Sequence, residues 1–304
     1  MFVGFNLLHP DQQSSLKCVT NMSSMVGTAA GHYGRPVTSG SVIIRWRHLL
    51  LVIGGVTEQY KDTPRPDILL YNAQKRCWVT SLKQFVKIRP GTRLHDVVQV
   101  NNLAYLIMTP IPNSEGIITT EGYIDVLNLE TACVDYKVDR MTCAKLPEEF
   151  NNKNFCCLKV GHKIYFVAEG MAWIFDTEIQ GWSKLAPPIG TIGHGRPVMT
   201  WAAPLVYLVS ARMEDSTNVV QMLDTDSGQW RRLPSLETRM TVLDMLCHNG
   251  LIYIIGWQPA RNNFVMTLDR STGETKVVLE GLQGVWSRGV VVKGKYFSDI
   301  FSQS

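Results

Sequence analysis

Five arginines share one setting in this sequence, because each stands close to the start of an apolar, β-rich run. They are Arg35, Arg93, Arg196, Arg239 and Arg288. Arg35 and Arg196 lie in duplicated Gly-Arg-Pro-Val strings, and His194 precedes the second copy. Guanidinium groups form bidentate, charge-assisted hydrogen bonds with carboxylates and phosphates. If the arginines converge, they predict a surface for an acidic or phosphorylated ligand. The alternative is that they form salt bridges and backbone hydrogen bonds between structural repeats.

Two tryptophans, Trp257 and Trp286, fall in or near the segments that carry these arginines. Tryptophan and arginine are enriched among the residues that dominate binding energy at protein interfaces. We therefore expect both tryptophans to act as apolar anchors beside the charged groups. Trp78, Trp182 and Trp230 recur at a regular spacing instead, so we expect them to pack in the core.

A repeated unit positions these residues. A bulky apolar residue followed by Asn or Asp recurs six times, at intervals of 45 to 66 residues. The copies are Phe5-Asn6, Tyr71-Asn72, Leu127-Asn128, Phe175-Asp176, Leu223-Asp224 and Leu268-Asp269. In three copies a tryptophan follows seven residues after the apolar residue, and the other three have Gln12, Val134 and Thr275 there. Periods near 50 residues are typical of the blades of a β-propeller.

Upstream of each pair, two β-rich runs flank a short turn. Val97–Val100 and Leu103–Met108 flank Asn101-Asn102, and 156–160 and 164–168 flank Gly161-His162. Asn and Gly tolerate the positive φ that tight hairpin turns require. Each repeat is therefore expected to form two hairpins, which make a four-stranded antiparallel sheet. Residues 147–153 are expected to form a single helical turn.

The two ends of the chain complement each other, because the last repeat has only its first two strands and the first residues resemble the missing two. This predicts an all-β fold, a six-bladed β-propeller with four-stranded antiparallel blades, closed by pairing of N-terminal with C-terminal strands. We expect one domain, 1–304, in which 1–22 and 286–304 share a blade. The other blades are expected at about 35–88, 89–142, 143–190, 191–238 and 239–285. A two-sheet sandwich or two small β-domains are the alternatives.

The first complete repeat resembles the Kelch family, through Leu51-Val52-Ile53-Gly54-Gly55, Tyr71 and Trp78. The glycine pair is reduced to Glu169-Gly170 and Ile255-Gly256 in later repeats. The chain looks most like the Kelch domain of BTB-Kelch substrate adaptors of cullin-RING ubiquitin ligases. That resemblance implies a non-catalytic module whose arginines ring the mouth of a central channel and capture a protein or peptide, with the BTB segment absent from this chain.

Charge, hydropathy and cysteine content limit which other partners and compartments we expect. The net charge is only +4 and the basic residues are scattered, which argues against a nucleic-acid partner. No apolar run reaches the length of a membrane helix, and seven cysteines without a pattern are typical of reduced thiols in the cytoplasm or nucleus. We expect no membrane partner.

Other activities have little support in the sequence. We expect no catalytic residue, cofactor or metal, because no nucleophile motif or metal-ligand spacing occurs. The alternatives are a carbohydrate-acting propeller enzyme, a copper-dependent one that would draw on His32, His95 and His194, and an actin-binding Kelch protein. His48, His162 and His248 are expected to be solvated turn residues.

Overall fold

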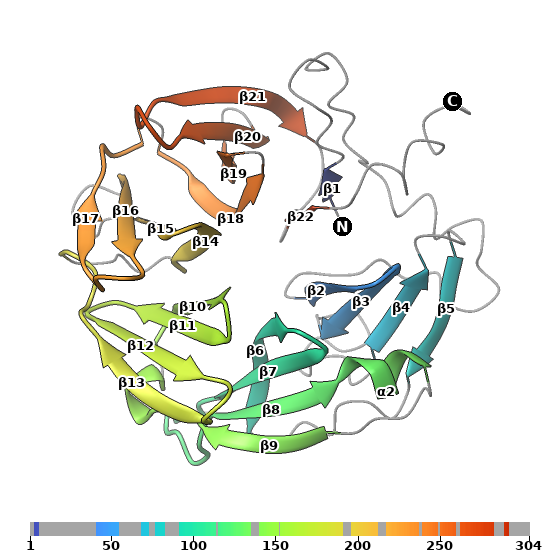
Figure 1. The fold of residues 1–304 in the computed structure, drawn as a ribbon. Helices are drawn as coiled ribbons and strands as arrows, with labels where there is room; N and C mark the ends of the chain where they lie inside the picture. The colour runs from blue at the N-terminus through green and yellow to red at the C-terminus, as the bar shows by residue number, and fades with distance from the viewer. Residues whose placement is uncertain are drawn as a thin grey trace. The chain divides into compact units, whose positions relative to one another are not determined.

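The computed structural model describes fourteen segments of the chain, and the description below concerns these segments alone. They are 3–5, 41–54, 68–72, 77–82, 91–113, 115–134, 140–151, 153–190, 196–211, 217–236, 239–248, 250–259, 262–282 and 289–291. Within them the chain forms five four-stranded sheets and one two-stranded sheet, with very little helix (Figure 1). Contacts divide the chain into two units: unit 1 comprises residues 1–87 and 282–304, and unit 2 comprises residues 88–281. The all-β prediction is confirmed.

Unit 1 contains one four-stranded antiparallel sheet and the two-stranded sheet. The larger sheet consists of β2 (Ser41–Trp46), β3 (Leu49–Gly54), β4 (Ile68–Asn72) and β5 (Cys77–Leu82), paired in chain order. Alternate residues of β2, namely Val42, Ile44 and Trp46, are buried. They share one face because side chains of a strand alternate. Arg47 takes a positive φ of 54° in the turn that follows, and its guanidinium lies 4.3 Å from the centre of the Trp46 ring.

The two ends of the chain meet in the smaller sheet, where β1 (Val3–Phe5) pairs with β22 (Gly289–Val291). The pairing is parallel, with Phe5 opposite Val291, which corrects the prediction that the ends join an antiparallel blade. Such short apolar runs carry a signal for strand formation but none for direction, because no hairpin connects them. The second predicted C-terminal strand and residues 6–22 lie outside the described segments.

Unit 2 contains four sheets, each with its four strands paired in chain order. The first consists of β6 (Thr92–Val100), β7 (Leu103–Pro110), β8 (Tyr123–Asn128) and β9 (Arg140–Lys145). The second consists of β10 (Phe155–Val160), β11 (Lys163–Ala168), β12 (Met171–Asp176) and β13 (Gly181–Leu185). The third consists of β14 (Val198–Ala202), β15 (Leu205–Ala211), β16 (Asn218–Asp224) and β17 (Trp230–Arg232). The fourth consists of β18 (Thr241–His248), β19 (Leu251–Gln258), β20 (Asn262–Asp269) and β21 (Thr275–Leu282), whose last residue belongs to unit 1.

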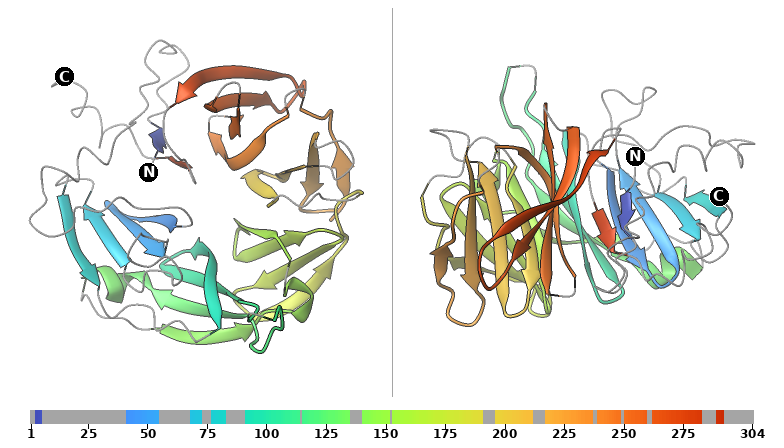
Figure 2. Two further views of the ribbon diagram at one scale, coloured as in Figure 1. Left: turned by 180° about the vertical axis from the view of Figure 1, so that it is seen from behind. Right: turned by 90° about the horizontal axis from the view of Figure 1, so that it is seen from above.

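Successive sheets of unit 2 pack face to face. Their first strands contact one another in series, β6 with β10, β10 with β14 and β14 with β18 (Figure 1 and Figure 2). An apolar layer fills each space between neighbours, and the layer between the first two sheets includes Tyr105, Phe155, Phe166 and Phe175. Burial of these large side chains provides the main driving force for the stacking.

The recurring Asn or Asp after each third strand organises the segment that follows. Asp176, Asp224 and Asp269 each accept two hydrogen bonds through Oδ1 from backbone N–H groups two and three residues on, which closes a tight turn. Asn128 accepts the same two bonds from Glu130 and Thr131, and there a helix follows, α2 (Leu129–Val134).

Helix α2 corrects the alignment of the second repeat, in which Val134 stands at the tryptophan position of the expected fourth strand. An Asn side chain at the N-cap favours a helix, and the fourth strand β9 begins only at Arg140. The helical turn expected within 147–153 is confirmed as η3 (Glu148–Phe150). None of the helices among the described residues is long and apolar enough to cross a membrane. The single-domain prediction and its blade boundaries stay a prediction.

The repeated tryptophans link each sheet to the one before it. The indole N–H of Trp182 donates to the backbone oxygen of Lys145, at 3.0 Å. The indole N–H of Trp230 donates to the backbone oxygen of Ala186, at 2.7 Å. Both rings are half-buried against the apolar layers. They therefore pack between sheets as expected, while the side chain of Trp78 lies outside the described part.

Candidate functional site

Four of the eight predicted site residues belong to the described segments, and all four lie in unit 2. They are Arg93, Arg196, Arg239 and Trp257. Arg35, His194, Trp286 and Arg288 lie outside the described residues. Arg93 is the second residue of β6, whereas Arg196 and Arg239 precede β14 and β18 by two residues.

Hydrogen bonds place the starts of the four first strands at one end of unit 2. His95 Nε2 of β6 lies 2.8 Å from the backbone oxygen of Phe155, the first residue of β10. Arg196, before β14, donates to Asp96 of β6 at 2.8 Å. Asn218 exchanges two hydrogen bonds with the backbone of Met240, just before β18. We call this end of unit 2, which carries Arg93, Arg196 and Arg239, the arginine end.

A β-bulge brings Arg93 and Asp96 to the same face of β6. Arg93 pairs with Thr109 and Asp96 with Ile107, so His95 is the extra residue and the two side chains stand two ladder positions apart. Without the bulge, residues three apart would point to opposite faces of the strand. Val98, two residues beyond Asp96, packs in the layer against the second sheet. The face that carries Arg93 and Asp96 is therefore the one that looks toward that sheet.

Asp96 is a buried carboxylate with two defined partners. Its Oδ1 accepts the backbone N–H of Val97 at 2.8 Å, and its Oδ2 accepts Nη2 of Arg196 at 2.8 Å. The Asp96 side chain is 3 % exposed, whereas the Arg196 side chain is 40 % exposed. The remaining guanidinium N–H groups of Arg196 have no partner among the described residues. Arg196 thus pairs within the protein, as one of the two expectations had it, and its side chain stays partly exposed. Its role toward a ligand stays a prediction.

The other two described arginines at this end, Arg93 and Arg239, are exposed. Trp257 is 42 % exposed and pairs across β18 and β19 with Thr241, which places it at the arginine end as well. With Arg196, these residues offer several cationic groups and a large apolar ring at one end of the unit. Such a combination suits a partner that carries acidic groups and an apolar side chain.

The loop between β7 and β8, residues 111–122, extends this surface. It leaves β7 at Pro110, which pairs with Thr92 at the start of β6, so the loop also lies at the arginine end. In the right-hand view of Figure 2 it projects beyond the sheets. Asn113 Oδ1 accepts the backbone N–H groups of Glu115 and Ile117, and Ile117 itself is 54 % exposed. The loop is ordered by its own hydrogen bonds and presents an apolar side chain.

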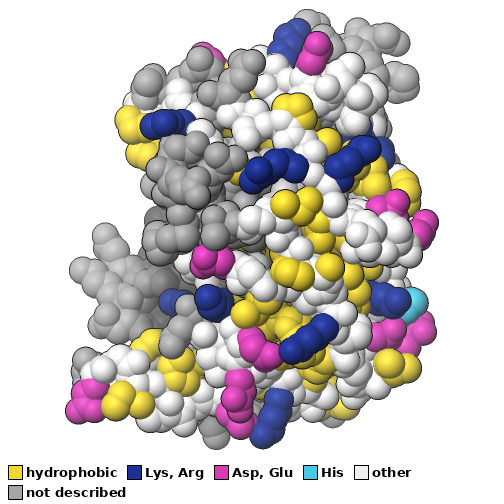
Figure 3. Space-filling model, turned by 90° about the vertical axis from the view of Figure 1, so that its left-hand side faces the viewer, with side chains coloured by type: hydrophobic (Ala, Val, Ile, Leu, Met, Phe, Trp, Pro, Cys, Tyr) yellow, Lys and Arg dark blue, Asp and Glu magenta, His cyan; other side chains and the backbone are white. Residues whose placement is uncertain are grey.

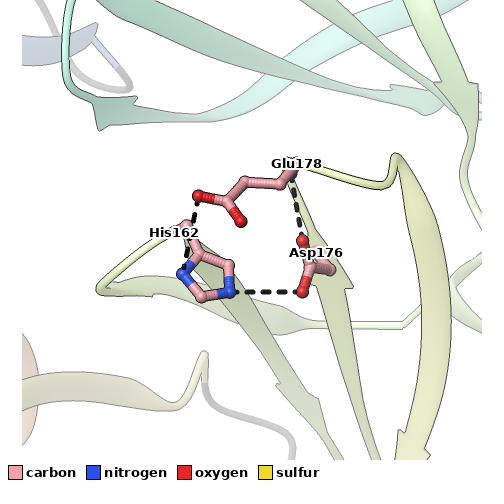
Figure 4. Close-up of side chains that lie close together, drawn as sticks. All are labelled: His162, Asp176 and Glu178. Atoms are coloured by element: carbon pink, nitrogen blue, oxygen red, sulfur yellow. Dashed lines mark hydrogen bonds and ion pairs between the residues drawn. The ribbon is translucent and has the colours of Figure 1, made fainter.

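A second group of polar side chains lies at the opposite end of the second sheet (Figure 4). His162 Nε2 is 3.3 Å from Asp176 Oδ2, and His162 Nδ1 is 4.0 Å from Glu178 Oε1. These are metal-ligand types, but the two carboxylates face different ring nitrogens, and a metal ion would need one nitrogen directed at both. The imidazole of His162 lies between the two carboxylates, with one ring nitrogen toward each. His162 was expected to be merely solvated, and the signal for its partner was the register that pairs Lys163 with Asp176.

The pKa of Asp176 is lowered in spite of partial burial. Desolvation of the carboxylate raises the pKa, but the backbone N–H groups of Glu178 and Ile179, together with His162 and Lys163, outweigh it. The net result is a carboxylate that stays ionised to lower pH than usual.

Other groups with possible chemistry are engaged in the fold. The imidazole of His95 stacks on Phe155 with ring centres 3.8 Å apart, and its Nε2 faces a backbone oxygen. Burial, with a contribution from Asp125, raises the pKa of the Cys143 thiol to about 11, so it stays protonated at neutral pH. Five cysteines form no disulfide: Cys133, Cys143, Cys156, Cys157 and Cys247.

The surface of the left-hand side of the molecule in Figure 1 shows acidic and basic side chains interspersed with apolar ones (Figure 3). A scan against models of protein families found no match for the chain, and a search of curated proteins found none either. The similarity to Kelch repeats stays a prediction from the residues of the first complete repeat.

Proposed function

We propose that this chain is a protein-interaction module, a six-bladed β-propeller of the Kelch type rather than an enzyme. Three features support the propeller: five sheets with the same strand order, first strands of unit 2 that contact one another in series, and pairing of the two ends of the chain. A ring of such sheets leaves only short edges, which explains why four-stranded sheets of this kind are stable when repeated.

The ligand of this module is an acidic or phosphorylated protein segment bound at the arginine end. The observation that carries this proposal is the guanidinium of Arg196, anchored on one edge by the buried Asp96 and open on the other. Exposed Arg93 and Arg239 add positive charge, and Trp257 adds an apolar contact. By its resemblance, the module serves as the substrate-recognition part of a cullin-RING ubiquitin ligase adaptor.

The test compares two variants that each lose two positive charges. Arg93→Ala/Arg239→Ala removes charge at the arginine end, and Arg231→Ala/Lys276→Ala removes charge from exposed positions on the outer strands β17 and β21. Partners captured from a cell extract by the wild type are identified, and binding is measured at rising salt. The first variant is expected to bind the acidic partners about thirtyfold more weakly and to show weaker salt dependence, since each of the two lost arginine contacts is worth on the order of 1 kcal/mol.

The control variant is expected to capture the same partners as the wild type. Equal loss in both variants would mean that only net charge matters. Full capture by Arg93→Ala/Arg239→Ala would show that the ligand binds elsewhere.

A further inference from the structure

We propose that Asp96 is the positioning residue of the arginine end, which holds the Arg196 guanidinium in the orientation that receives an oxyanion of the ligand. This inference rests on the proposed function and adds to it a residue that does not itself touch the ligand. It also specifies the ligand chemistry as two neighbouring carboxylates or one phosphate.

The ion pair spans a long path in the chain. Asp96 lies on β6 of the first sheet, and Arg196 precedes β14 of the third sheet, one hundred residues later. Strand β10 of the second sheet contacts both β6 and β14, so the Arg196 side chain reaches past the second sheet to find its partner. Local sequence preference does not produce such a contact. It forms only when the first three sheets of unit 2 are in place.

The orientation of the Asp96 carboxylate is also set by contacts that do not involve Arg196. The bulge at His95 turns the carboxylate to the interior face, and the backbone N–H of Val97 holds Oδ1 at 2.8 Å. The guanidinium of Arg196 binds the other oxygen, Oδ2, of a side chain that is 3 % exposed. A rigid acceptor of this kind restricts the rotation of the guanidinium plane, and an arginine ordered in advance loses less entropy when a ligand binds.

A second copy of the same local structure offers an internal comparison. Strand β18 carries a bulge between Val242 and Asp244, and Asp244 Oδ1 accepts the backbone N–H of Met245 at 2.9 Å. The bulge and its aspartate are therefore a local device that occurs twice. The ion pair with Arg196 belongs to Asp96 alone.

Arg93 defines the ligand more closely. It is exposed and stands two ladder positions from Asp96 on the same face of β6, so Arg93, Arg196 and Asp96 together carry a net positive charge. A ligand that binds both arginines must offer oxygen atoms to each guanidinium group. Two neighbouring carboxylates, or one phosphate, present enough oxygen atoms for both arginines.

The experiment uses two blocked peptides, one of alternating glutamate and glycine and one in which a phosphoserine replaces a central glutamate. Affinities are measured by calorimetry for the wild type, Asp96→Asn, Arg196→Ala and the double variant. Asp96→Asn is expected to weaken binding by about tenfold while keeping the shape of the side chain. In the Arg196→Ala background the same substitution is expected to have no further effect, because Asp96 acts only through Arg196.

Two controls keep the result interpretable. Asp244→Asn removes an equal charge from the matching bulge of β18 and is expected to leave affinity unchanged. Arg196→Lys keeps a cation beside Asp96, so the melting temperature is expected to stay near that of the wild type while affinity falls, since an ammonium has no second donor edge. If Asp96→Asn fails to fold, Arg196→Lys still decides the question.

Each outcome has one meaning. Unchanged or tighter binding by Asp96→Asn overturns the positioning role, as does wild-type affinity in Arg196→Lys. An equal loss from Asp96→Asn with and without Arg196 shows that the substitution acts on the fold. Failure of the wild type to bind either peptide overturns the proposed function, and the positioning role with it. Preference for one peptide identifies the source of the oxyanions.

Discussion

At the residue scale, the Asp or Asn that ends each third strand of unit 2 stabilises the next turn in the same way. Asp176, Asp224 and Asp269 each bind two backbone N–H groups of the following turn, and Asn128 binds two in the first sheet of unit 2. The pKa of Asp224 is lowered by the N–H groups of Ser227 and Asp226, and that of Asp269 by the hydroxyl and N–H of Ser271. The repeated motif in the sequence is thus a turn-forming device, not a binding site.

This device predicts a specific response to acid. A carboxyl group with a lowered pKa in the folded state contributes stability above its unfolded pKa of about 3.9. That contribution is lost as the pH falls through the folded pKa. Replacement of Asp224 and Asp269 by Asn, which forms the same turn at Asn128, is expected to flatten the fall in stability below about pH 4. Urea unfolding from pH 6 to pH 2 measures it, and an acid response equal to that of the wild type would contradict the assignment.

At the scale of the elements, the tryptophans explain how neighbouring sheets keep their alignment. Each of the two indole N–H groups binds a backbone oxygen at or just beyond the fourth strand of the preceding sheet. The hydrogen bond therefore fixes the position of one sheet relative to the next along the strand direction. Gly256 at the end of the β19 core plays a related part, because a Cβ there would collide with Met240 and lie 3.2 Å from the Phe264 ring. A side chain at the glycine of the Ile255-Gly256 remnant would therefore require the Met240 side chain to move.

The contribution of the indole hydrogen bond can be separated from that of the ring. Trp182→Phe keeps an aromatic ring but removes the donor to Lys145, so we expect a loss of about 1 kcal/mol in the free energy of unfolding. Trp201→Phe is the control, since Trp201 is 41 % exposed on β14 and makes no indole hydrogen bond among the described residues. Urea unfolding at neutral pH measures both. An equal effect at the two positions would remove the special role of the repeated tryptophan.

At the scale of the whole molecule, the sequence predicted the features that depend on neighbouring residues, namely strands and turns. Apolar runs and turn residues identified the four-stranded sheets, and the Asn or Asp positions located their third strands. Helix α2 escaped prediction because an Asn that caps a turn also caps a helix. The ion pair of Arg196 with Asp96 and the group around His162 also escaped, because both depend on contacts between segments that only the folded chain brings together. The binding role of the five arginines stays a prediction from the sequence.

The pairing of the two ends predicts that both contribute to stability. Removal of residues 1–7 deletes β1 and leaves β22 without its partner strand, so we expect the melting temperature to fall by a few degrees, at about 2–4 °C for each kcal/mol lost. Removal of residues 302–304 keeps both strands and serves as the control. Differential scanning calorimetry measures the two deletions. A melting temperature unchanged by loss of β1 would show that the ends fold independently of each other.

The loop between β7 and β8 closes on a single atom. The backbone oxygen of Gly91 accepts hydrogen bonds from both the N–H of Ile111 and the hydroxyl of Thr120. The beginning and the end of the loop are therefore held together by the same acceptor atom. Anything between those two residues can change in length or composition without disturbing the scaffold, because lengthening a closed loop costs only about 0.6 kcal/mol for each doubling. The segment between Ile111 and Thr120 is consequently a site where a foreign recognition sequence can be inserted to give the module a new target.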